Sequence, residues 1–151
     1  MADDKRSGPR RERGRGDGHP VRASETRRGF VLVVDDVEDN RDLYATYFEH
    51  SGYRTAQASD GEQALALIAR EAPDVVIMDL SMPTLDGWEA TRLIKSNPRT
   101  RHVVVVVVTG NATEANMAAA RSAGADDVCT KPCLPRELLA VVERELSSRR
   151  R

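Results

Sequence analysis

The sequence predicts a doubly wound α/β fold, in which a five-stranded parallel sheet has helices on both faces. Five short apolar runs alternate with five longer segments whose apolar residues recur every three to four positions. The runs that begin at residues 30, 75 and 103 are continuously apolar, which indicates strands buried on both faces. Strict alternation of strands and helices is typical of an open sheet wound in this way.

Local signals mark where most of these elements begin and end. Asp60 and Thr113 are suited to cap the second and fourth helices, and Gly52 and Gly124 lie just past the first and fourth. The Asn97–Pro98 pair closes the third helix, because proline disfavours helical geometry in the residue before it. We expect strands at 30–35, 54–58, 75–79, 103–109 and 127–130, and helices at about 38–50, 61–71, 86–96, 113–123 and 135–148.

Length and charge indicate one domain with charged ends. The 151 residues, 40% of them hydrophobic, suffice for one core. Residues 1–29 have almost no large apolar side chain, so we expect a disordered basic arm there, a domain over 30–148 and a basic tail at 149–151. The ends together hold twelve Lys and Arg against five Asp and Glu, a net charge of +7, which leaves −8 on the domain. That charge argues against nucleic acid as a partner of the domain, and the arm has no aromatic residue for base stacking.

The sequence favours the cytoplasm. Cys129 and Cys133 cannot form a disulfide framework, and three separated histidines do not make a zinc site. The longest apolar run, Val103–Val108, is far below the roughly 18 residues of a membrane span. Residues 26–30 resemble a twin-arginine export motif, but the apolar run behind it ends at Val34, short of the roughly 7 to 15 residues of a signal sequence. We interpret it as the junction of arm and first strand.

Polar side chains stand at the carboxyl ends of four predicted strands. Asp79 ends a buried strand, where a carboxylate is costly without a partner or a task. Asp35 and Asp36 stand at the end of the first strand, Thr109 ends the fourth and Lys131 follows the fifth. Ligands of open α/β sheets bind outside the carboxyl ends of the strands, where the strand order reverses. We therefore expect these five residues to converge on one edge.

This set of side chains points to phosphoryl transfer. Two carboxylates at about 4 Å repel by about 4 kcal/mol at an effective dielectric near 20, so a cation is required among them. Mg²⁺ is the most suitable cation, since it prefers oxygen ligands and recruits phosphate as a further one. Lys131 offers a positive charge and Thr109 a hydroxyl for phosphoryl oxygens. Asp79 is the candidate nucleophile.

Five motifs, in order and at the right spacings, resemble the receiver domain of two-component response regulators. They are Asp35-Asp36, Val75–Pro83 around Asp79, Asp86–Glu89, Thr109-Gly110 and Lys131-Pro132. The resemblance covers about residues 30–148. It implies a flavodoxin-like sheet in the order 2-1-3-4-5 and a cis peptide between Lys131 and Pro132.

The resemblance also implies roles for individual residues. Asp79 would accept a phosphoryl group from a phosphohistidine on a sensor histidine kinase or a histidine phosphotransfer protein. Asp35 and Asp36 would hold Mg²⁺, with Asp79 itself and the backbone carbonyl of Ser81 as further ligands. Lys131 would bind the phosphate, and Thr109 would move toward it.

One departure concerns the output. Receivers often have Tyr or Phe three residues before the lysine, where this chain has Val128, so the aromatic part of the switch is missing. About three residues follow the last helix, and we expect a stand-alone switch without an output domain that acts by contact with a downstream protein. It would catalyse only its own phosphorylation and dephosphorylation, and would not be an enzyme toward external substrates.

Two other functions stay open at the level of the sequence. One is a receiver-like binding module that acts without phosphorylation. The other is a phosphatase with an aspartyl nucleophile, as in the haloacid dehalogenase-like enzymes. Those phosphatases place a second Asp two residues after the nucleophile, where this chain has Ser81.

Overall fold

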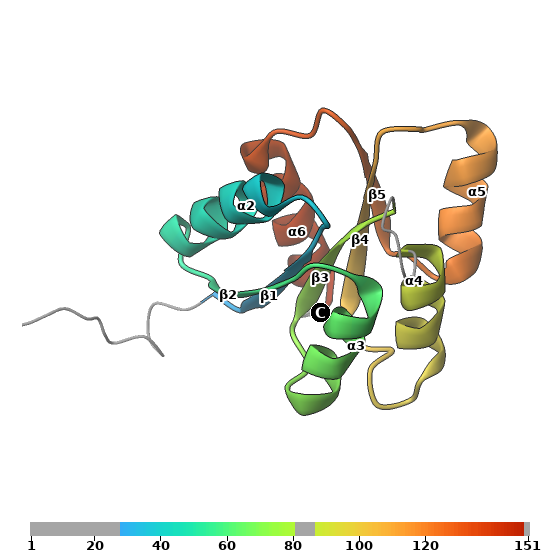
Figure 1. The fold of residues 1–151 in the computed structure, drawn as a ribbon, viewed down its shortest axis with the longest axis horizontal. Coiled ribbons are helices and arrows are strands. Elements are labelled where there is room, and N and C mark those ends of the chain that lie inside the picture. The colour runs from blue at the N-terminus through green and yellow to red at the C-terminus, as the bar shows by residue number, and fades with distance from the viewer. Residues whose placement is uncertain (1–27, 81–86, 150–151) are drawn as a thin grey trace, which may run out of the picture.

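A parallel sheet in the order β2-β1-β3-β4-β5 lies at the centre of the molecule (Figure 1). The computed structural model describes residues 28–80 and 87–149. The strands are β1 (Phe30–Val34), β2 (Arg54–Ala58), β3 (Val75–Asp79), β4 (Val104–Thr109) and β5 (Asp127–Thr130). The predicted strand order is confirmed, and every strand lies within one residue of its expected bounds.

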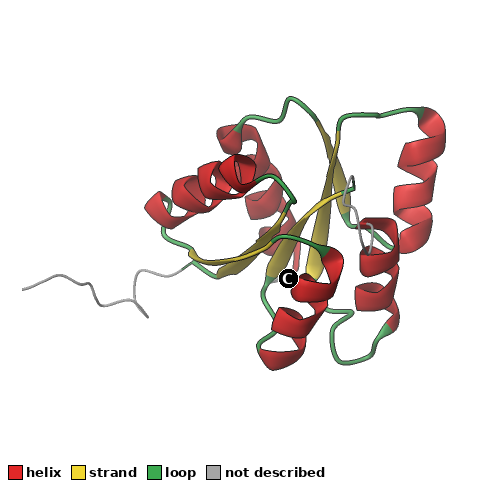
Figure 2. Ribbon diagram, viewed as in Figure 1, coloured by secondary structure: helices red, strands yellow, loops and turns green. Residues whose placement is uncertain are grey.

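Two layers of helices cover the sheet (Figure 2). On one face lie α2 (Glu38–His50) and α6 (Pro135–Arg149), and on the other lie α3 (Gly61–Arg70), α4 (Gly87–Ser96) and α5 (Glu114–Ala123). The expected caps are present: the Asp60 side chain accepts a hydrogen bond from the backbone N–H of Gln63, and the Thr113 side chain accepts one from the backbone N–H of Asn116. Gly124 ends α5 in the left-handed region, at φ +99°. None of the helices described here is long and apolar enough to cross a lipid bilayer.

Alternating residues of the central strands divide the core into two halves. In β1, Val31 and Val33 pack with Phe48 of α2 and Leu138 of α6, whereas Leu32 and Val34 pack toward α3 and α4. Every residue of β3 and β4 is buried. Each buried Val, Leu or Ile side chain contributes about 1.5 to 3 kcal/mol, and burial on both faces accounts for the continuous apolar runs in the sequence.

The residues at both ends of the described chain contact the rest of the domain. Arg28, expected in the arm, pairs with Glu143 of α6 at 2.7 Å and stacks over the Tyr53 ring. Arg149, expected in the tail, is the last residue of α6 and pairs with Asp126 at 2.8 Å. These contacts cannot be read from the sequence, because the paired residues are distant along the chain. The remainder of the expected arm and tail, residues 1–27 and 150–151, lies outside the described residues.

Candidate functional site

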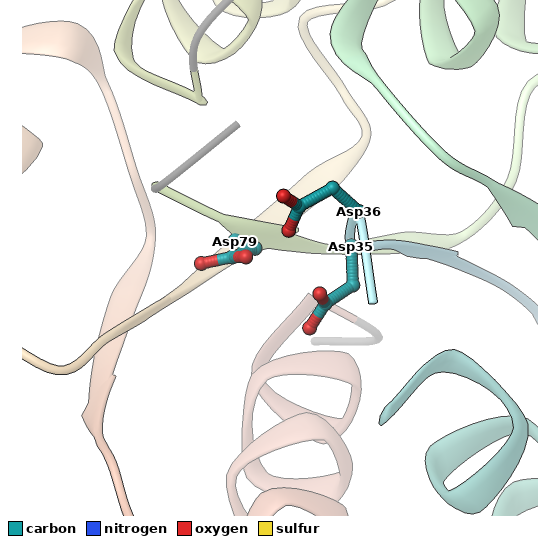
Figure 3. Close-up of side chains that lie close together, drawn as sticks. All are labelled: Asp35, Asp36 and Asp79. Atoms are coloured by element: carbon teal, nitrogen blue, oxygen red, sulfur yellow. The ribbon is translucent and has the colours of Figure 1, made fainter. Parts of the chain in front are cut away.

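Three carboxylates meet at the carboxyl edge of the sheet, between β1 and β3. Asp79 is the last residue of β3, and Asp35 and Asp36 directly follow β1, its neighbour in the sheet. Figure 3 shows the three side chains extending into the same space, and their nearest oxygens all lie within 4.8 Å of one another. Asp35 and Asp79 are buried, with 4% and 3% of their surface exposed, while Asp36 is exposed. The predicted convergence of these carboxylates is present.

The lysine and threonine expected at this edge are there as well. Lys131 follows β5, and its Nζ lies 3.4 Å from Oδ1 of Asp79. Its amide donates to the carbonyl oxygen of Thr109 at 2.8 Å, and its peptide bond to Pro132 is cis, as the resemblance implied. Thr109 is buried at the end of β4, and its Oγ1 accepts from the Asn111 amide at 3.0 Å.

The environment of Asp35 opposes its ionisation. Burial raises the pKa of this carboxyl group, and the charge of Asp79 adds to the effect. The Val37 amide, which donates to Oδ1 at 2.9 Å, and the charge of Lys131 both act in the opposite direction. A cation bound beside Asp35 would favour the ionised carboxylate.

The donor set fits a hard divalent cation. It consists of three aspartate carboxylates, two of which are buried, and includes no histidine or cysteine. Carboxylate oxygens are the ligands that Mg²⁺ prefers. Asp35, Asp36 and Asp79 are the residues that would hold the ion. Ser81, the fourth ligand implied by the resemblance, lies outside the described residues, as does Asp86.

Two supporting residues at this edge had no assigned role at the level of the sequence. Arg41 of α2 donates to the carbonyl oxygen of Asp35 at 2.8 Å and to Gln57 at 3.1 Å, so it ties the loop after β1 to β2. Gly87 begins α4 against the end of β3. A Cβ at this position would lie 2.4 Å from the carbonyl oxygen of Asp79, and only glycine permits this approach.

The two cysteines lie close to Lys131 along the chain, in surroundings that disfavour the thiolate form. Both are buried, Cys129 in β5 and Cys133 in the loop that follows. Burial raises the pKa of Cys129 to about 12 and also raises the pKa of Cys133. Because the thiolate is the reactive form, this environment disfavours redox or nucleophilic chemistry.

Comparison with known proteins identifies the family. The model of the response regulator receiver domain matches residues 31–143. The chain belongs to this family. Receiver domains are phosphorylation switches of two-component systems and generally bind Mg²⁺ in an acidic pocket, so this receiver has that general function.

Curated relatives of this receiver include larger and smaller proteins. Response regulator PleD of Caulobacter vibrioides is 38% identical over 102 residues, which are 68% of this chain and 22% of PleD. The polar-differentiation response regulator DivK of Brucella anthropi is 33% identical over 102 residues, which are 68% of this chain and 83% of DivK. The chain thus spans about a fifth of PleD and most of DivK.

Solved structures with the same fold include receivers of similar size. The chemotaxis protein CheY4 of Vibrio cholerae superposes with a TM-score of 0.73 at 27% identity, over 76% of this chain and 96% of CheY4. A putative response regulator of Chloroflexus aurantiacus superposes with a TM-score of 0.75 at 28% identity, over 79% of this chain and 98% of the Chloroflexus chain. The flavodoxin-like fold expected from the sequence is therefore confirmed.

Proposed function

We propose that this receiver accepts a phosphoryl group on Asp79 from the phosphohistidine of a sensor histidine kinase or a histidine phosphotransfer protein. The observation that supports this most directly is the placement of Asp79, a buried carboxylate with the Lys131 ammonium group at 3.4 Å and two further carboxylates within 4.8 Å. A lone buried carboxylate would be costly, whereas here it has a cationic partner and a candidate cation site.

The reaction assigns one task to each group. An Asp79 carboxylate oxygen attacks phosphorus, the bond from phosphorus to the histidine nitrogen breaks, and the imidazole leaves with that electron pair. Lys131 then stabilises the negative oxygens of the phosphoryl group. Asp35, Asp36 and Asp79 would hold Mg²⁺, which would supply further neutralisation of charge.

The threonine provides the response to phosphorylation. The Thr109 hydroxyl group bonds to the backbone of Asn111 in the loop after β4. When Oγ1 turns to donate to a phosphoryl oxygen, that loop loses its bond and moves. Val128 stands where an aromatic residue would change its rotamer in many receivers. The movement of Thr109 and its loop is therefore the change that a downstream protein would detect by contact. Free buried thiols fit a cytoplasmic location.

Phosphorylation by a small donor tests the proposal without knowledge of the kinase. Wild type, Asp79→Asn and the control Asp39→Asn, an exposed carboxylate of α2, are incubated with acetyl phosphate and Mg²⁺, and the intact proteins are weighed. We expect a mass gain of one phosphoryl group in wild type and control, its loss in Asp79→Asn, and its loss on addition of a chelator. An equal gain in all three proteins would refute Asp79 as the acceptor, and multiple turnover of a generic phosphate ester would indicate a phosphatase instead.

A further inference from the structure

A buried tyrosine contacts the loop that holds the phosphate-binding lysine. The hydroxyl group of Tyr44, on α2, donates to the carbonyl oxygen of Cys133 at 2.7 Å, and this hydrogen bond is buried. The two residues are 89 positions apart in the chain. Cys133 follows the Lys131–Pro132 peptide directly, so the bond links α2 to the segment that presents the lysine.

Hydrogen bonds on both sides of Cys133 hold the backbone of this segment in place. The amide of Lys131 donates to Thr109, and the amide of Leu134 donates to the Glu137 side chain at 3.0 Å. The bond from Tyr44 lies between these two. It ties the segment to α2, the helix that follows the carboxylates Asp35 and Asp36.

The lysine side chain itself is weakly held. A third of its surface is exposed, and its ammonium group lies at 3.4 Å from Asp79, a long distance for a charge-assisted hydrogen bond. A lysine stem has several rotatable bonds, so where Nζ can reach depends on where the backbone of residues 131–133 is fixed. A shift of this backbone would therefore move the ammonium group relative to the phosphoryl acceptor.

The phenol is suited to be a permanent donor. Tyr44 is 8% exposed and packs with Phe48 and Leu138 in the core under α2 and α6. Burial raises the pKa of Tyr44 to about 12, so its hydroxyl group keeps its proton at any physiological pH. A buried backbone carbonyl requires a donor, and removing the hydroxyl group would leave the Cys133 carbonyl without this one.

We propose that Tyr44 is a positioning residue for phosphoryl transfer, which fixes the Cys133 carbonyl and thereby aims Lys131 at Asp79. This inference rests on the proposed function of Asp79. It assigns to α2 a part in the chemistry that is separate from the carboxylates, because Tyr44 acts on the lysine side of the site.

Conservative substitutions separate this role from a general contribution to folding. Tyr44→Phe removes the hydroxyl group and keeps the buried ring. The matched control is Tyr47→Phe on the same helix, since the Tyr47 hydroxyl group makes no hydrogen bond with any described residue. The rate of phosphorylation by acetyl phosphate is measured at saturating Mg²⁺ and expressed per folded molecule, with the folded fraction taken from circular dichroism. We expect Tyr44→Phe to be about fivefold to tenfold slower than wild type, less than the roughly 100-fold that a 1 Å misplacement can cost, and the control to be unchanged.

A double-mutant cycle with Lys131→Ala decides whether the effect passes through the lysine. In the Lys131→Ala background, Tyr44→Phe should cause no further loss, and in either background it should leave the affinity for Mg²⁺ unchanged. If wild type is phosphorylated and Tyr44→Phe matches it, or if the loss persists without Lys131, the inference is wrong while the proposed function stands. If wild type itself gains no phosphoryl group, the proposed function fails first.

Discussion

Gly87→Ala should destabilise this receiver, although alanine is the better helix former. In α4, the exchange gains at most about 1 kcal/mol in helix propensity. The added Cβ would lie 2.4 Å from the Asp79 carbonyl oxygen and 2.9 Å from Cα of Leu80, both backbone atoms that cannot rotate away. Overpacking of this kind typically costs about 1 to 3 kcal/mol, and a clash with backbone atoms puts the cost near the upper value. After subtraction of the gain in helix propensity, we expect the free energy of unfolding to fall by about 2 kcal/mol.

Urea unfolding measures this loss. With a slope of roughly 1 to 3 kcal/mol per molar urea for small proteins, the midpoint of Gly87→Ala should fall by about 1 M. The control is Gly110→Ala, at the same edge of the sheet, where a Cβ would lie 3.9 Å from the nearest atom, the Lys131 Cδ. Its stability should change by no more than about 0.5 kcal/mol. A Gly87→Ala variant as stable as wild type would refute the close approach of α4 to β3.

Two further predictions concern charge. The pKa of Asp35 is raised above its ordinary value of 3.8, so the protonated side chain stabilises the folded protein. In the metal-free protein this contribution to the free energy of unfolding should be complete below about pH 3.8 and should be lost as pH rises through the raised pKa. Urea unfolding in the presence of a chelator over this pH range should show the loss, and Mg²⁺ should restore stability at neutral pH. If the stability of Asp35→Asn depends on pH in the same way as that of wild type, the effect does not come from Asp35. Asp126→Ala should cost about 3 kcal/mol in thermal or urea unfolding, since it removes the carboxylate partner of the largely buried Lys95 ammonium group, which keeps two backbone carbonyls as acceptors, and the side-chain acceptor of the Val105 backbone amide. Arg144→Ala removes only the exposed ion pair between Arg144 and Asp127 at 2.7 Å, which solvent screens, so it should cost much less than Asp126→Ala. Equal costs for the two variants would contradict this ranking.

The fold could be predicted almost completely, because its signals are local. Strands buried on both faces need uninterrupted apolar residues, and the runs in β1, β3 and β4 have them. Asp60 and Thr113 cap their helices with their own side chains. By contrast, α2 begins at Glu38, and Val37 before it offers no side-chain cap, so the start of this helix was inferred from the helical pattern alone.

The site residues that could be predicted lie at the ends of strands. Those that were missed depend on contacts between residues that are distant in the sequence. Asp35, Asp36 and Asp79 are recognisable because a carboxylate at the end of a buried strand is costly without a partner or a task. Tyr44 looks in the sequence like any aromatic residue on the buried face of a helix, and its partner at Cys133 is brought near only by folding. Gly87 was recognised as part of a motif, but the reason for glycine there is the backbone of β3, which a motif does not display.

The course of α6 has a practical consequence for experiments on Asp79. The helix starts beside Lys131 and runs back along the sheet, so that Arg149 reaches the carbonyl of His102, just before β4 begins. Arg28, ahead of β1, pairs with Glu143 of the same helix. Residues 28 and 149 therefore both lie at the edge of the sheet opposite the phosphorylation site. A fluorophore or other label placed at residue 28 or 149 would therefore sit at the edge of the sheet opposite Asp79.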